Sequence, residues 1–187
     1  MHDIYVIIAV LCWAIFWIYW FINKSHQKPT QQLPNTKDTL LYRILWPLAF
    51  VFLIVPFPFL SLRLWPSSFV VGILGDVIAL LGLVVCILAR RELAGNWSMQ
   101  LDLKKDHELI TTGPYAFVRH PIYTGFVLLF LGTAITVGTI GGWIGLVILL
   151  VGCWIRIQNE EKFVMVTFGE KYRNYKKHVK ALIPYIW

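Results

Sequence analysis

Residues 4–22 form a nearly unbroken apolar segment, and this feature limits the possible folds of the chain most strongly. At about 1.5 Å per residue in a helix, the segment can cross a hydrocarbon layer of roughly 30 Å. No basic region precedes it and no small-residue cleavage motif follows, so it reads as a mature helix rather than a signal peptide. Only 14% of the residues are charged, whereas soluble domains carry roughly 25%. The chain is therefore expected to be an integral membrane protein.

Four further apolar segments follow, at residues 40–65, 69–89, 121–137 and 143–155. Three prolines interrupt the segment at 40–65, so a kinked or broken helix is expected there. Glycines separate the last two segments, which predicts a tight helical hairpin. The predicted fold class is an all-α integral membrane protein with five transmembrane helices, the last two forming a hairpin, plus a cytoplasmic C-terminal helical segment.

Basic residues predict the orientation of these spans. Of the 17 Lys and Arg residues, Arg63 alone is expected on the side of the membrane that holds the N-terminus. The positive-inside rule then places the N-terminus outside and the C-terminus in the cytoplasm, and a multi-pass protein of the cell (inner) membrane is expected. The net charge of +7 is not accompanied by any nucleic-acid-binding motif, so anionic lipid headgroups are the expected partners. The sequence gives no indication of oligomeric state.

Several isolated residues in the apolar segments are expected to be structural. Asp76 is the one acidic residue within a predicted span, and a structural or interfacial role is favoured over a mechanistic one because no basic residue is near it in sequence. Cys12, Cys86 and Cys153 lie in apolar runs without metal-ligand spacing, so they are expected to be buried thiols. No metal site is predicted.

Three residues at the start of the segment 121–137 are unusual for their place. Pro121 suits the first position of a helix, because its missing N–H would be unpaired there. Arg119 and His120 do not suit a helix N-terminus, where the macrodipole favours anions. An anionic group brought by a ligand would explain them; contact of Arg119 with a lipid phosphate would also explain them.

A second polar cluster follows the last apolar segment directly. Arg156 and Glu160 are i,i+4 neighbours if that helix continues, and Glu161 adds a second acid. Acids are disfavoured at a helix C-terminus and beside anionic lipid, so a solvated ion pair alone does not account for both of them.

Four motifs, in order, resemble one known family. They are "GNWSMQ" at 95–100, "HELITTGPYAFVRHPIY" at 107–123, "RIQNEE" at 156–161 and "FGEKYRNYKK" at 168–177. This pattern is similar to the isoprenylcysteine carboxyl methyltransferases and their prokaryotic relatives, within a wider group that includes phospholipid N-methyltransferases. The resemblance covers roughly the last half of the chain. It implies one membrane methyltransferase domain over 1–187, with three spans in 1–89 and a cofactor-binding catalytic core in 90–187.

The resemblance also implies a cofactor and a site. The cofactor would be S-adenosylmethionine, held at the cytoplasmic face. The expected cofactor-binding residues are Gln100, His107, Glu108, Leu109, Ile110, Tyr115, Arg119, His120, Pro121, Ile122, Tyr123 and Glu160, and the expected catalytic residues are Arg156, Glu160 and Glu161. Arg156 would be associated with the substrate.

The residue types agree with this assignment but leave the acceptor open. A sulfonium, a carboxylate and an adenine ring require an anion, donors and a flat apolar slot. The expected acceptor is a lipophilic carboxylate that enters from the bilayer, because a carboxylate needs only an anchor such as Arg156. An amine of a phospholipid headgroup would require a base, for which Glu161 or His120 is available. A membrane scaffold without cofactor and an intramembrane reductase that uses a nicotinamide are the remaining alternatives.

Overall fold

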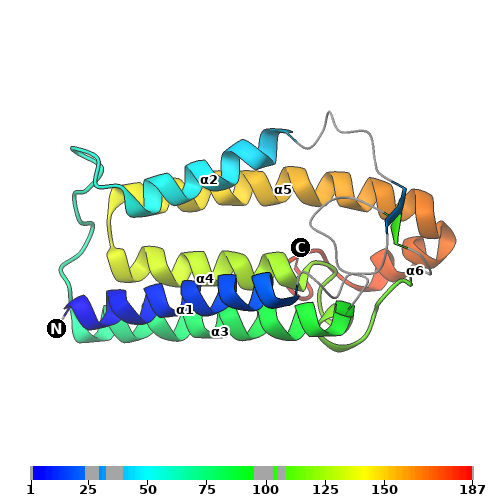
Figure 1. Ribbon diagram of the computed structural model, residues 1–187, viewed down its shortest axis with the longest axis horizontal. Coiled ribbons are helices and arrows are strands. Elements are labelled where there is room, and N and C mark those ends of the chain that lie inside the picture. Colours follow the sequence, from blue (N-terminus) through cyan, green and yellow to red (C-terminus); the bar gives the residue numbers. More distant parts are fainter. Residues whose placement is uncertain (1, 24–29, 33–39, 95–102, 105–107, 187) are drawn as a thin grey trace.

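The computed structural model describes residues 2–23, 30–32, 40–94, 103–104 and 108–186 (Figure 1). Most of these residues are helical. The helices are α1 (His2–Ile22), α2 (Leu40–Ile54), α3 (Phe69–Leu93), the 3-10 helix η4 (Gly113–Ala116), α4 (Pro121–Val137), α5 (Ile140–Phe168) and α6 (Glu170–His178). Two short strands, β1 (Thr30–Gln32) and β2 (Leu103–Lys104), pair antiparallel. The predicted all-α class is therefore confirmed for the described chain, apart from this small ribbon.

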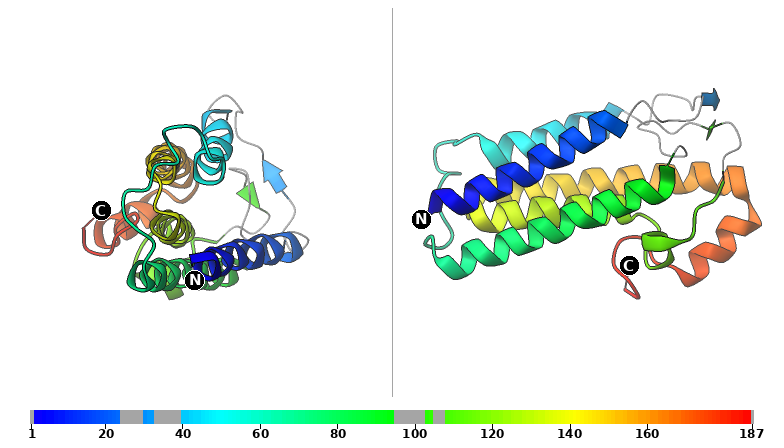
Figure 2. Two further views of the ribbon diagram at one scale, coloured as in Figure 1. Left: turned by 90° about the vertical axis from the view of Figure 1, so that its left-hand side faces the viewer. Right: turned by 60° about the horizontal axis from the view of Figure 1, so that its bottom comes forward.

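The long helices lie side by side as an elongated bundle. Helix α2 runs along α5, while α4 and α1 both run along α3 (Figures 1 and 2). Aromatic side chains fill the space between these two groups. The Trp13 ring on α1 meets Phe50 on α2 edge-on at 4.7 Å and Phe126 on α4 at 5.4 Å. Edge-to-face contacts of this kind are favourable beyond the area that they bury.

Helices α3 and α4 pack closely through glycine. A Cβ atom on Gly82 would come within 2.5 Å of the carbonyl oxygen of Gly125, closer than real Cβ atoms approach. Gly75 and Gly132 form a second contact of the same kind one heptad away. Small residues let helix backbones approach in this way inside membranes, where dispersion and hydrogen bonds rather than water drive association.

In the part of the chain that the structure describes, three helices are long and apolar enough to cross a membrane, namely α1, α3 and α5. The chain is therefore a multi-pass membrane protein. Helices α2 and α4 are apolar but shorter. The helix expected to be kinked or broken contains Pro47 and ends at Ile54, before Pro56, as its proline pattern predicted.

The predicted hairpin is present, and its second helix is longer than expected. Helix α4 ends at Val137, Gly138 takes a left-handed conformation with φ 70°, and the Thr139 hydroxyl accepts a hydrogen bond from the Gly142 N–H to cap α5. Helix α5 then continues to Phe168 rather than ending near residue 155. The prediction that Glu160 and Glu161 lie at the end of this helix is wrong, because α5 runs on for roughly two more turns.

The isolated residues of the apolar segments are buried. Cys12, Cys86 and Cys153 are free and buried, as predicted. Asp76 is buried in α3, where the Thr136 hydroxyl of α4 donates to its Oδ1 at 3.4 Å. This contact supplements the glycine packing of α3 on α4.

Candidate active site

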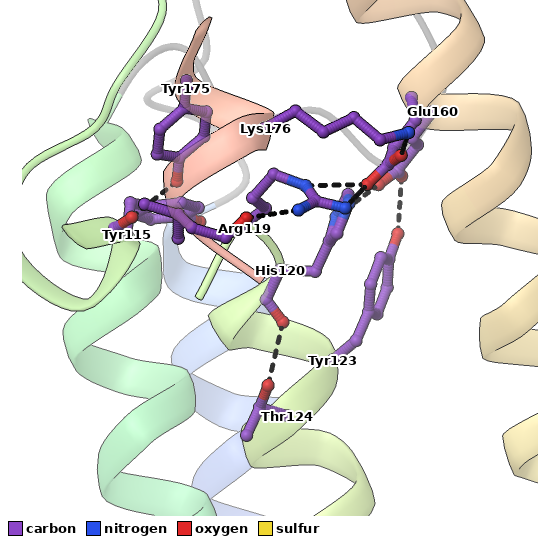
Figure 3. Close-up of polar contacts among 10 residues, drawn as sticks. Tyr115, Arg119, His120, Tyr123, Thr124, Glu160, Tyr175 and Lys176 are labelled. Carbon is purple, nitrogen blue, oxygen red and sulfur yellow. Dashed lines mark hydrogen bonds and ion pairs between the residues drawn. The ribbon is translucent and has the colours of Figure 1, made fainter. Parts of the chain in front are cut away.

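The segment before α4 is built so that the His120 side chain faces into the protein. His120 occupies the N-cap position but makes no side-chain capping bond, while its carbonyl accepts the first helical hydrogen bond from the Thr124 N–H at 3.0 Å. Pro121 follows at N1, as predicted, and it is fully buried. The imidazole ring is therefore free to point toward α5, as Figure 3 shows.

Glu161 accepts hydrogen bonds from two cationic side chains. Its Oε1 accepts from the Arg119 Nε at 2.8 Å and from a second nitrogen of the same guanidinium, and its Oε2 accepts from the Lys176 ammonium of α6. The Glu161 side chain is 6% exposed and that of Arg119 is 8% exposed. Charge-assisted hydrogen bonds in so dry a setting are stronger than those in water.

Glu160 faces a different set of partners. Its Oε1 accepts from the Arg156 Nε at 2.7 Å and from the Tyr123 hydroxyl at 2.5 Å. Arg156 also donates to the Tyr123 hydroxyl at 3.1 Å. The predicted i,i+4 pair of Arg156 and Glu160 is confirmed, and it is buried on the arginine side, where the side chain is 4% exposed.

His120 stands between the two carboxylates. Its Nδ1 lies 3.5 Å from Glu160 and its Nε2 lies 3.4 Å from Glu161. Burial by itself lowers the pKa of His120, but the hydrogen bonds and negative charges of the two glutamates outweigh burial and raise its pKa above the usual 6.5. The two carboxylates therefore favour the protonated form of the ring.

The anions that face Arg119 and His120 are thus carboxylates of the chain itself. A ligand anion at this helix N-terminus was one of the expectations from the sequence, and it stays a prediction. Helix α5 brings Glu160 and Glu161 to the start of α4, where they face Arg119 and His120. We refer to Arg119, His120, Tyr123, Arg156, Glu160, Glu161 and Lys176 as the polar cluster.

Tyr115 lies at one side of this cluster. It is buried in η4, and its carbonyl accepts from the Tyr175 hydroxyl of α6 at 2.5 Å. Burial raises the pKa of Tyr175 to about 12, so this hydroxyl remains a donor at neutral pH. In Figure 3 Tyr115 and Tyr175 lie together, on the other side of Arg119 from Glu160. Helix α6 therefore covers both Tyr115 and the polar cluster.

Three of these residues were not identified from the sequence. Tyr42 of α2 accepts from the Arg156 guanidinium, which also stacks 4.5 Å from the centre of the Tyr42 ring. Lys176 and Tyr175 belong to the motif at 168–177, but the sequence assigned them no role in the site. Tyr42 lies in an apolar segment 114 residues from Arg156, so no local pattern could have linked the two.

Among the remaining predicted residues, some lie outside the described chain, and the side chains of the others, which the structure describes, form no hydrogen bond or ion pair with the polar cluster. Gln100 and His107 lie outside the described residues. Glu108, Leu109 and Ile110 belong to the irregular segment before η4, with Glu108 exposed and the other two half-buried. The Ile122 carbonyl accepts from the Cys86 thiol at 3.4 Å, which ties α4 to α3.

An open apolar groove lies at the opposite end of the bundle. It encloses about 330 Å³ and is lined by Leu64, Trp143 and neighbouring aliphatic residues of α5. Its lining carries no ionisable side chain.

The fold and the cluster define an integral membrane protein with a buried site of mixed charge at the ends of its helices. The sequence model of the phospholipid methyltransferase family matches residues 70–171, more than half of the chain. The chain belongs to this family. The matched range includes nearly the whole polar cluster.

Individual relatives agree with this assignment. The Schizosaccharomyces pombe protein-S-isoprenylcysteine O-methyltransferase is 38% identical over 44% of this chain and 35% of the relative. The Dictyostelium discoideum protein of the same name is 26% identical over 95% of this chain and 75% of the relative. Further relatives are named methanethiol S-methyltransferases.

One solved structure shares the fold. It is that of a eukaryotic intramembrane Ras methyltransferase, isoprenylcysteine carboxyl methyltransferase, with a TM-score of 0.58 and 25% identity. The match covers 79% of this chain and 53% of the solved chain. The present chain thus spans about half the length of that protein and about a third of the fission-yeast relative. The predicted resemblance to isoprenylcysteine carboxyl methyltransferases is confirmed.

Proposed function

We propose that this protein transfers a methyl group from S-adenosylmethionine to the carboxylate of a lipophilic acceptor that reaches the site from the bilayer. The observation that carries this proposal is the composition of the polar cluster. Three permanent cations, Arg119, Arg156 and Lys176, face two carboxylates there, and His120 adds positive charge. The site therefore has an excess of positive charge that suits an anionic acceptor.

The residues present fit the proposed cofactor. S-Adenosylmethionine supplies a methyl group on a positively charged sulfonium, together with a carboxylate and an adenine ring. Glu160 and Glu161 are the anions that can balance a sulfonium, and Arg119 with His120 can donate to a carboxylate. The buried ring of Tyr115 offers an aromatic surface for adenine. The other proposed contacts are Gln100, His107, Glu108, Leu109, Ile110, Pro121, Ile122 and Tyr123.

Arg156 is the proposed anchor of the acceptor. Its guanidinium is fixed by Glu160, Tyr123 and Tyr42, so little side-chain freedom is lost when an acceptor carboxylate binds. A carboxylate is already a nucleophile at neutral pH, and alignment of the reacting atoms at about 3–3.5 Å supplies much of the acceleration. Glu160 acts through its hold on Arg156 and through its charge, and Glu161 through its hold on Arg119 and Lys176.

The same charge argument disfavours a phospholipid amine as acceptor. An amine arrives as an ammonium, which would add to the positive charge of the sulfonium and of the cations in the cluster. A base would have to remove its proton, yet Glu160 and Glu161 are both engaged by cations. The amine remains the alternative that the experiment below distinguishes.

The proposed membrane arrangement has five crossings. It adds α2 and α4 to the three long helices, with flanking residues extending each short helix, and it places the N-terminus outside and the polar cluster at the cytoplasmic face of the inner membrane. Arg63 supports this orientation, because it hydrogen-bonds the Val137 carbonyl at the end of α4 that is remote from the cluster. In this arrangement residues 1–89 support a catalytic core at 90–187.

Methyl-labelled S-adenosylmethionine incubated with the purified protein and membrane lipids tests the proposal. The expected product is a lipophilic molecule whose label is released by mild base, as a methyl ester requires. A base-stable label would instead indicate amine methylation. If no label is transferred and calorimetry in detergent shows no binding of S-adenosylhomocysteine, the protein is a scaffold rather than an enzyme. Glu170→Gln changes an exposed acid on α6 outside the polar cluster, so this variant should transfer label as the wild type does.

A further inference from the structure

Residues 179–182, which we call the strap, run alongside the segment that carries Arg119 and His120. The Arg119 N–H donates to the Lys180 carbonyl at 2.7 Å, and the His120 N–H donates to the Ala181 carbonyl at 3.0 Å. These two bonds fix the backbone of both site residues from outside the helix that follows them. The strap therefore helps to fix the positions of the Cα atoms from which the Arg119 and His120 side chains extend.

Further contacts anchor the strap itself. The Thr124 hydroxyl in the first turn of α4 donates to the Leu182 carbonyl at 2.8 Å, and the Arg119 guanidinium donates to the Val179 carbonyl. Ala181 and Leu182 are both buried. Displacement of the strap would break bonds to the Arg119 backbone and the Arg119 side chain together.

Residues 183–186, which we call the tip, form a tight turn with its apolar side chains outward. The Ile186 N–H donates to the Ile183 carbonyl at 3.2 Å across Pro184 and Tyr185. Tyr185 takes φ 65°, a left-handed conformation that usually requires glycine or asparagine at this turn position. Its side chain is nevertheless 89% exposed, and that of Ile186 is 74% exposed. A turn built only for shape would not place a large aromatic residue here.

The surroundings of the tip match the headgroup region of an anionic membrane. The C-terminal end of the described chain lies beside the start of α4 (Figure 1), where the Thr124 hydroxyl donates to the Leu182 carbonyl. Lys177 and Lys180 are exposed close to the tip in sequence, and Phe117 is exposed on the segment that the strap contacts. Exposed aromatic and aliphatic side chains with adjacent lysines are the combination that binds anionic lipid at an interface.

We propose that the tip inserts into an anionic lipid surface and that the strap transmits this contact to Arg119 and His120, so that lipid binding holds the site in its assembled geometry. This inference deepens the proposed function by naming a lipid partner that regulates the same site. It rests on that function only in taking the polar cluster as the active site. The partner is a lipid surface of phosphatidylglycerol type, recognised by negative charge and apolar depth.

Hydrogen exchange of the Arg119 and His120 amides tests the inference, because both amides donate to the strap. The full chain is placed in nanodiscs of phosphatidylcholine alone or of phosphatidylcholine mixed with phosphatidylglycerol, and exchange is followed by mass spectrometry or NMR. Exchange at the two amides is expected to be about tenfold slower with phosphatidylglycerol. Tyr185→Gly is expected to abolish this difference. Glycine suits the left-handed position, so the variant removes the lipid-binding ring without straining the turn.

Two further variants make the result decisive. Val166→Ser removes an exposed apolar side chain of α5 and should leave the lipid effect intact. Leu182→Ala should speed exchange in both lipids, because it loosens the strap itself. Equal exchange of the wild type in the two lipids, or an unchanged lipid effect in Tyr185→Gly, would overturn the inference. Neither readout requires methyl transfer, so these failures would leave the proposed function standing.

Discussion

Helix α4 makes two contacts of opposite character. Along its length it meets α3 through bare glycine backbones, and a Cβ on Gly82 would collide with Gly125. At its N-terminal end it meets α5 through charges, where His120 and Tyr123 reach Glu160 and Glu161. Adding a side chain to one of the glycines should disrupt the contact with α3, whereas removing a charged side chain should disrupt the contact with α5. The contact with α3 positions α4, and the contact with α5 gives the site its chemistry.

The largest effect is expected from an addition to the glycine contact. Gly82→Leu forces the backbones of α3 and α4 apart and should reduce the free energy of unfolding in detergent by more than about 3 kcal/mol. Thermal unfolding followed by tryptophan fluorescence measures this. Val84→Leu, an enlargement at a lipid-facing position of the same helix, should change stability little. Similar stabilities of the two variants would show that α3 and α4 are not in close backbone contact.

Removal of a charge from the other contact is expected to have the next largest effect. Glu161→Gln leaves Arg119 and His120 without their shared anion and should cost about 2 kcal/mol of stability, together with most of the methyl transfer. The matched control is Glu170→Gln, because Glu170 also pairs with an arginine but its side chain is 70% exposed. An exposed pair of this kind contributes about 0–1 kcal/mol. Equal losses in the two variants would contradict the burial of the cluster.

The sequence predicted the contact between α4 and α5 better than the contact between α4 and α3. Its two motifs around His120 and Glu160 were expected to meet, and the structure brings them within hydrogen-bonding distance. The contact of Glu161 with Arg119 and His120 was not predicted, because hydropathy did not show how far α5 continues beyond the apolar segment. The glycines at 75, 82, 125 and 132 are seven residues apart in each helix, but their pairing depends on which helices are neighbours.

The partners of the buried arginines show why these contacts could not be predicted from the sequence. Glu161 lies 42 residues from Arg119, and Tyr42 lies 114 residues from Arg156. Such pairs are set by the packing of α2, α4 and α5 rather than by periodicity within one element. In the sequence Tyr42 is an ordinary tyrosine of an apolar segment. Its role becomes visible only in the structure, where its hydroxyl accepts from the Arg156 guanidinium.

A smaller effect is expected from Tyr42→Phe. The variant removes the hydroxyl that accepts from Arg156 but keeps the ring against the guanidinium. Loss of this hydrogen bond should weaken acceptor binding by about 1 kcal/mol, which raises KM roughly fivefold. Steady-state kinetics with the acceptor varied measures this, and the KM for the cofactor should not change. Tyr5→Phe, at the other end of the bundle, is the control. If KM for both substrates stays at the wild-type value, Tyr42 does not position Arg156.

The smallest effect is expected in the pH dependence of stability. The pKa of His120 is raised in the folded protein by Glu160 and Glu161. The stability that its charge contributes is therefore fully present below the unfolded pKa of about 6.5 and is lost as the pH rises through the higher folded pKa. The Tm difference between the wild type and His120→Gln should shrink over that interval. A difference that grows with pH would show that His120 is neutral between the two carboxylates.

Binding of S-adenosylhomocysteine to the purified protein in detergent tests the central claim most directly, since that claim is that the polar cluster holds the cofactor. Isothermal titration calorimetry should show saturable binding to the wild type and to Glu170→Gln, and binding at least about tenfold weaker to Glu160→Gln. Thermal unfolding should show that Glu160→Gln remains folded under the same conditions. Unchanged affinity in a folded Glu160→Gln would contradict the claim.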